Sequence, residues 1–148
     1  MTVLRLTRRF DAPRERVFAA WTDPEVLRTW WAARPDWEGA AADVDLRPGG
    51  RYRLSMRDTA NGAVHSVSGE YREVRPPERL AYTWSWDGAP AEMAGSADTL
   101  VVVEFAEADG GTEVTLTHEG FASGDIRDLH GEGWRGCLDS LERRVFLS

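Results

Sequence analysis

The sequence predicts an α+β fold in which a curved antiparallel sheet of about six to seven strands wraps around a long C-terminal helix. Three observations predict it: two short helical segments after a first strand, a long middle section of alternating apolar and polar residues, and a return to helical spacing at the end. We expect a single domain over residues 1–148. Only a long amphipathic helix supplies enough apolar surface to cover the concave side of such a sheet.

Two short helices are expected between residues 11 and 31, directly after a first strand at 3–10. Asp11 precedes Pro13 and Asp23 precedes Pro24, so each segment combines a capping aspartate with a proline. Proline suits the first helical turn because the N–H it lacks would have no partner inside the helix, and an aspartate can accept from the free donors. The bulky apolar residues that follow are expected to cover the core; they are Val17, Phe18, Trp21, Val26, Leu27, Trp30 and Trp31.

The middle section alternates with period two, as half-buried antiparallel strands do. Further strands are expected at 43–46, 51–57, 64–74, 80–86, 99–106 and 112–118. Turns are expected at Pro48-Gly49-Gly50, at Asn61-Gly62, at 75–78 and at 109–111, where glycine, asparagine or proline occurs. Gly69 falls inside the expected 64–74 strand and is interpreted as a bulge.

The last segment returns to helical spacing, with apolar residues forming one broad stripe over residues 126–145. Either Ser123 or Asp125 is expected to cap its start. Gly131, Gly133 and Gly136 interrupt this helix, although each glycine costs about 0.5–1 kcal/mol relative to alanine. Two explanations stay open: close approach of the helix backbone to the sheet, or room for a guest molecule under the helix.

Composition excludes several classes of protein. The net charge of −7 argues against a nucleic-acid binder, and no apolar run is long enough to insert into a membrane. The N-terminus lacks the hydrophobic core of a signal peptide, and Cys137 is the only cysteine, so we expect a reducing, cytoplasmic location. The three histidines lack close spacing, so we expect no metal and no cofactor.

Aromatic and other apolar residues in phase on the strands and the last helix are expected to face a common interior. The candidates for lining a cavity are Tyr52, Leu54, Met56, His65, Tyr82, Trp84, Trp86, Phe105, His118, His130, Trp134 and Leu138. Walls of this kind suit a flat or elongated apolar ligand. The segments 32–42 and 87–98 show no periodicity and are expected to be loops near the rim of the cavity.

Five runs of the chain carry a family resemblance. They are APRERVFAAWTDPEVLRTWW, DLRPGGRYR, EVRPPERLAYTW, GTEVTLTHEGF and HGEGWRGCLDSLE. In this order they resemble the family related to the C-terminal domain of the activator of the heat shock protein 90 ATPase. That family belongs to the START-like, birch-pollen-allergen-like superfamily (SRPBCC), so the resemblance implies a helix-grip fold with a cavity between sheet and last helix. It implies no catalytic residues.

Three functions follow as expectations. The first is binding of a small hydrophobic or amphipathic ligand in the cavity. The second is a cyclase-like or hydratase-like enzyme that uses His65, His118 or Tyr82 for proton transfer. The third is a chaperone-interacting module; the eukaryotic activator has an additional N-terminal domain that this chain is too short to contain, so this function ranks last. A homodimer is a further expectation, because Trp30, Trp31 and Trp37 are expected to form an exposed aromatic surface.

Overall fold

The computed structural model describes residues 2–87 and 99–146 of the chain. Its elements are β1 (Val3–Phe10), α1 (Arg14–Thr22), α2 (Pro24–Trp30), β2 (Trp37–Val44), β3 (Arg51–Asp58), β4 (Val64–Arg75), β5 (Arg79–Asp87), β6 (Thr99–Ala108), β7 (Gly111–Glu119) and α3 (Gly124–Leu141), followed by a π-helical segment (Glu142–Phe146). The expected order of strands and helices is confirmed.

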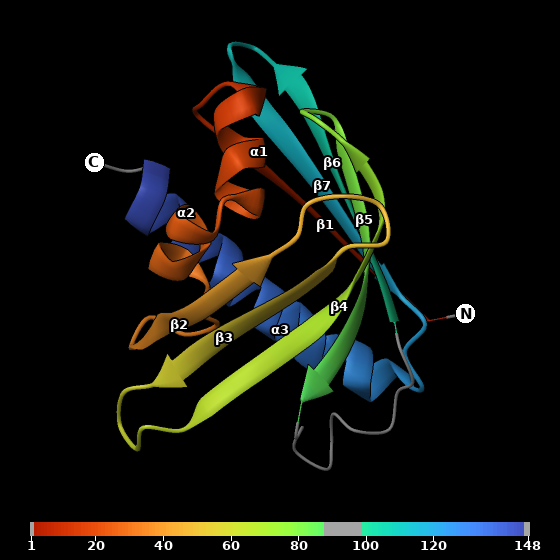
Figure 1. Ribbon diagram of the computed structural model, residues 1–148. Coiled ribbons are helices and arrows are strands. Elements are labelled where there is room, and N and C mark those ends of the chain that lie inside the picture. The colour runs from red at the N-terminus through yellow and green to blue at the C-terminus, as the bar shows by residue number, and fades with distance from the viewer. Residues whose placement is uncertain (1, 88–98, 147–148) are drawn as a thin grey trace.

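The seven strands form one antiparallel sheet in the order β1-β7-β6-β5-β4-β3-β2. The sheet curves strongly, and α3 lies along its concave side while α1 and α2 lie at one end (Figure 1). This is the helix-grip arrangement that the sequence predicts. Since every neighbour in the order except the β1–β7 pair is also a neighbour in sequence, short turns account for most of the sheet.

The helix caps agree with the sequence in part. Asp23 accepts a hydrogen bond from the Glu25 backbone N–H at 3.0 Å and caps α2, and Ser123 accepts from the N–H of Ile126 at 3.3 Å and caps α3. Asp11 does not cap α1, because Pro13 occupies the capping position and the Asp11 carboxylate pairs with Arg9 instead.

Two details of the strands differ from the expectation. β2 begins at Trp37, so residues 37–42 belong to a strand rather than to a loop; their run of glycine and alanine carries no alternation, yet they pair with β3. The irregularity in β4 lies between Tyr71 and Glu73 rather than at Gly69. Gly69 instead allows close approach of β5, since a Cβ there would overlap the carbonyl group of Thr83.

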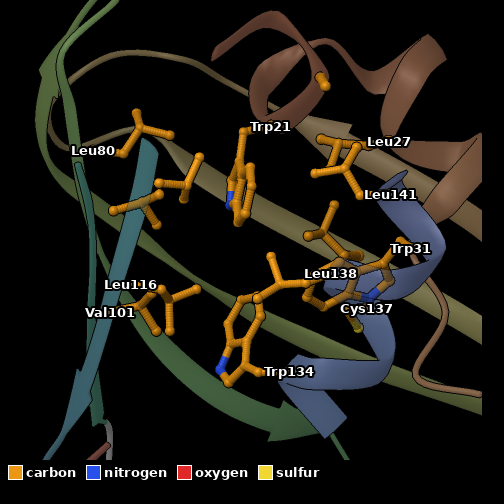
Figure 2. Close-up of a cluster of buried hydrophobic side chains, with 14 of the residues drawn as sticks. Trp21, Leu27, Trp31, Leu80, Val101, Leu116, Trp134, Cys137, Leu138 and Leu141 are labelled. Atoms are coloured by element: carbon orange, nitrogen blue, oxygen red, sulfur yellow. The ribbon is translucent and has the colours of Figure 1, made fainter. Parts of the chain in front are cut away.

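The core is filled at the end of the sheet where α1 and α2 lie. Figure 2 shows Trp21 of α1 between Leu80 of the sheet and Leu141 of α3, which leaves little room at this end. Trp30 and Trp31 are only 0% and 2% exposed, so the expected exposed aromatic surface is wrong for both. They are buried because α2 packs inward, where the Trp30 indole N–H donates to the carbonyl of Ala20 at 2.8 Å.

Within residues 2–87 and 99–146, no helix combines the length and the apolar character needed to cross a bilayer.

Candidate functional site

A pocket of about 430 Å³ lies beside the middle of α3, between that helix, strands β3 to β5 and the segment that links α2 to β2. Six of the predicted cavity residues line it: Met56, His65, Trp84, Trp86, His130 and Trp134. The remaining six do not; Tyr52, Leu54, Tyr82, Phe105, His118 and Leu138 belong to the buried core around it. The pocket thus lies at one end of the concave side, and the other end is packed.

The lining also contains residues that the sequence did not single out for the cavity: Trp31, Ala33, Arg34 and Pro35 of the linking segment, and Trp37 at the start of β2. On α3, Leu129, Glu132, Gly133 and Cys137 complete the lining. The expectation of a rim loop over 32–42 holds for its first part, up to Asp36. Of the second expected rim loop, 87–98, residues 88–98 lie outside the described residues.

Tryptophan dominates the walls, with five of the seven tryptophans of the chain in the lining. Trp84 lies at the centre of this group: its ring centroid is 5.9 Å from that of Trp31, 5.5 Å from that of Trp86 and 5.1 Å from that of Trp134. Most of these pairs are edge-to-face, the geometry that the charge distribution of aromatic rings favours. The mutual packing holds the rings in place, so the walls are rigid and apolar.

One rim of the pocket is a stack of three side chains. The Trp37 and His65 rings lie nearly parallel, 11° apart in plane and 5.1 Å between centroids, and the guanidinium of Arg34 lies 5.6 Å from the Trp37 ring. Arg144, from the π-helical segment, donates to the carbonyl oxygens of Pro35 and Trp37 at 3.2 and 2.7 Å. These two hydrogen bonds connect the rim to the π-helical segment.

His130 is a neutral hydrogen-bonding group in the pocket wall. Its Nδ1 donates to the carbonyl of Ile126, and its Nε2 accepts from the indole N–H of Trp86, both at 2.9 Å. A carbonyl oxygen only accepts, so the proton lies on Nδ1. Burial lowers the pKa of His130, although the bond to Ile126 opposes this, so the ring stays uncharged at neutral pH.

His118 lies behind the wall, fully buried, and both of its ring nitrogens are engaged. Its Nδ1 accepts from the indole N–H of Trp134 at 3.1 Å, and its Nε2 lies 2.7 Å from the hydroxyl of Thr99. That hydroxyl donates in turn to the carbonyl of Trp84 at 3.3 Å, so Nε2 carries the proton. Burial, helped by nearby His130, lowers the pKa of His118 to about 2.

Tyr82 is likewise a core group. Its hydroxyl oxygen accepts from the indole N–H of Trp21 at 3.3 Å, and burial raises its pKa above the ordinary value. Cys137 lines the pocket as a free thiol whose pKa burial raises to about 12, so it is a neutral apolar contact. Among the described residues, no group of three metal-ligating side chains is close enough to hold a metal ion.

The indole N–H groups of Trp31 and Trp84 are the exceptions to this pattern. Both are buried, and neither has a hydrogen-bond acceptor within the described parts of the chain. An unpaired buried donor carries an energetic cost of about 1–3 kcal/mol.

The glycines of α3 differ in their surroundings, and the close approach at Gly136 is to the linking segment rather than to the sheet. A Cβ on Gly136 would overlap the backbone carbonyl of Ala33, so this glycine permits close approach of the linking segment. A Cβ on Gly133 would meet nothing within 4 Å, and Gly133 lines the pocket. Gly133 therefore widens the pocket where a side chain would narrow it.

Comparisons with known proteins agree with this architecture. A Chromobacterium violaceum protein of known structure is 28% identical, with 99% of each chain covered and a TM-score of 0.84. An AHSA1-like protein from Aeromonas hydrophila is 28% identical over 97% of this chain and 92% of its own, with a TM-score of 0.78. A Plasmodium falciparum protein described as an HSP90 activator is 23% identical (97% and 95% covered, TM-score 0.71), and at that identity it shows a shared fold.

A search of curated proteins found no match to the chain. A family model does match it. The model for Activator of Hsp90 ATPase homolog 1-like protein matches residues 11–145, which is nearly the whole sequence. The helix-grip fold is the one that the SRPBCC superfamily, to which this family belongs, adopts. The chain belongs to the Activator of Hsp90 ATPase homolog 1-like family.

Proposed function

We propose that this protein binds a small apolar or amphipathic molecule in the tryptophan-lined pocket beneath α3. The observation that carries the proposal is a hollow of about 430 Å³ walled by five indole rings, at the point where the helix has a glycine in place of a side chain. This volume lies within the range of pockets that enclose small-molecule ligands. A core that only needed to be filled would place a side chain at Gly133.

The hydrogen bonds around the pocket favour binding over proton transfer. Of the three residues considered for acid–base chemistry, His118 and Tyr82 lie outside the lining and are engaged by Trp134 and Trp21. Their pKa values shift away from neutrality, which opposes proton exchange near pH 7. His65 is in the lining, but it stacks on Trp37.

Thermal unfolding in the presence of a library of fatty acids and aromatic compounds tests the proposal. We expect at least one class of compound to raise the Tm of the native protein, because a ligand that binds only the folded state stabilises it. Gly133→Leu fills the pocket and should abolish the shift, while Gly133→Ala, which adds one methyl group, keeps most of it. The proposal fails if no compound raises the Tm, or if Gly133→Leu responds as the native protein does.

The family name provides a second candidate, action on a chaperone ATPase. A pull-down and an ATPase assay with the chaperone of the same host test it directly. An increase in the ATPase rate supports this function, and an unchanged rate with no complex formed excludes it.

A further inference from the structure

The unpaired indole N–H groups of the lining tryptophans are buried and are not exposed to a ligand. The buried N–H groups of Trp31 and Trp84 have no acceptor among the described residues, and an indole nitrogen cannot accept. His130 offers neither a free donor nor a free acceptor, because Ile126 and Trp86 occupy both ring nitrogens. The polar part of a ligand therefore meets the side chains of Arg34, Glu132 and His65.

Arg34 places a positive charge at the rim. Its guanidinium lies over the Trp37 ring and forms no ion pair within the described residues, although the protein as a whole carries a net charge of −7. Stacking on an aromatic face leaves the N–H groups at the edge of the guanidinium free to bind a carboxylate or a similar anion. The carboxylate of Glu132 also lines the pocket, but no hydrogen bond or ion pair among the described residues fixes its position.

Aromatic rings form much of the pocket lining. The Trp37–His65 stack and the edge-to-face group around Trp84 both contribute to it. Aromatic rings pack on such surfaces with an energy beyond that of their buried area, which a flexible alkyl chain does not gain.

We infer that the ligand is a planar aromatic molecule with an acidic group, with the ring system among the tryptophans and the acid at Arg34. The inference rests on the proposed function and adds to it the chemical class of the ligand and the residue that recognises its charge.

Two fluorescent probes that differ by one acidic group test the inference. 1-Anilinonaphthalene-8-sulfonate is anionic, and N-phenyl-1-naphthylamine has the same ring system without the sulfonate. We expect both to bind the native protein and to quench its tryptophan fluorescence. Arg34→Ala should lower the affinity for the anionic probe by about 5-fold or more, because a charge-assisted hydrogen bond is lost. The affinity for the neutral probe should change by less than about 2-fold.

Three further variants serve as controls. Arg34→Lys keeps the positive charge and should restore part of the affinity for the sulfonate. Glu132→Gln removes a negative charge from the pocket lining and should increase the affinity for the sulfonate probe. Arg47→Ala removes an exposed arginine that pairs with Asp45 outside the pocket, and should change neither probe. Thermal unfolding of each variant confirms that it is folded.

The outcomes separate the two proposals. If neither probe binds the native protein, or if both bind Gly133→Leu unchanged, the pocket is not a ligand site and the proposed function fails as well. If both probes bind and are lost in Gly133→Leu, but Arg34→Ala affects them equally or not at all, the binding function stands and the inference about an acidic ligand is overturned.

Discussion

Two histidines surrounded by aromatic rings act as hydrogen-bond acceptors for tryptophan. His118 accepts from Trp134, and His130 accepts from Trp86. Each needs an unprotonated ring nitrogen for this, so protonation would break the bond and place a charge among apolar groups. The same contacts that position two pocket walls therefore make the fold sensitive to acid.

The stability of the fold should fall as the pH drops below about 6.5. Burial holds the pKa of His118 down to about 2, whereas an unfolded histidine has a pKa near 6.5. Below pH 6.5 the unfolded state binds more protons than the folded state, so the free energy of unfolding decreases as pH falls, by up to about 1.4 kcal/mol per pH unit for this one group. Urea unfolding at pH 7.5, 6.5 and 5.5 measures the slope.

His118→Gln isolates this contribution. Glutamine can accept from Trp134 and donate to Thr99 without titrating, so the variant should lose stability at pH 7.5 but show a shallower decline toward pH 5.5. An unchanged slope in the variant would contradict the assignment of His118 as a neutral buried group.

Residue phase placed the cavity candidates on the inward face of the strands and of the last helix, and six of the twelve line the pocket while the other six lie in the core. It could not separate Trp84 and His130, which line the pocket, from Tyr82 and His118, which do not. Alternation along a strand identifies a face of the sheet. The position of a residue along the concave side depends on the register between strands and on where α1 packs.

At the scale of elements, α3 uses its glycines for two different purposes. Gly136 lies against the backbone of Ala33, in the segment that leads from α2 to β2, while Gly133 faces open space in the pocket. Alanine at each position adds the same methyl group. It therefore distinguishes a glycine packed against backbone from a glycine that faces open space.

Gly136→Ala should destabilise the protein by about 1–3 kcal/mol, because the new Cβ would displace the Ala33 carbonyl and shift a pocket wall. Gly133→Ala should leave stability unchanged or raise it by about 0.5–1 kcal/mol through higher helix propensity. Chemical denaturation of the two variants provides the comparison. An equal change in the free energy of unfolding at both positions would mean that the linking segment does not contact α3 closely at Gly136.

Most elements could be predicted from the sequence because turn residues and apolar periodicity mark their ends. The start of β2 could not, since residues 39–42 are small and show no alternation. Residues 32–36 of the linking segment 31–36 are expected as a loop, but the segment is not expected to line the cavity. This segment nevertheless supplies Trp31, Arg34 and Pro35 to the pocket. Its position depends on contacts with distant residues, such as the bonds from Arg144, which no local pattern reveals.

At the scale of the whole molecule, the concave side of the sheet is divided into a filled end and an open end. Trp21 of α1 packs against Phe105 and Trp30, with ring centroids 5.8 and 5.3 Å apart, and closes one end. No helix other than α3 covers the other end, beside β3 to β5, among the described residues (Figure 1). α1 and α2 fill one end of the concave side of the sheet. The pocket lies at the other end, which α3 alone spans.

Nuclear magnetic resonance of the indole N–H groups tests the central claim most directly, because the seven tryptophans divide between the two ends. On titration with 1-anilinonaphthalene-8-sulfonate, the signals of the five lining tryptophans (Trp31, Trp37, Trp84, Trp86 and Trp134) should shift or broaden, while those of Trp21 and Trp30 stay in place. Shifts confined to Trp21 and Trp30, or no shift in any of the seven signals, would contradict the existence of a binding pocket beneath α3.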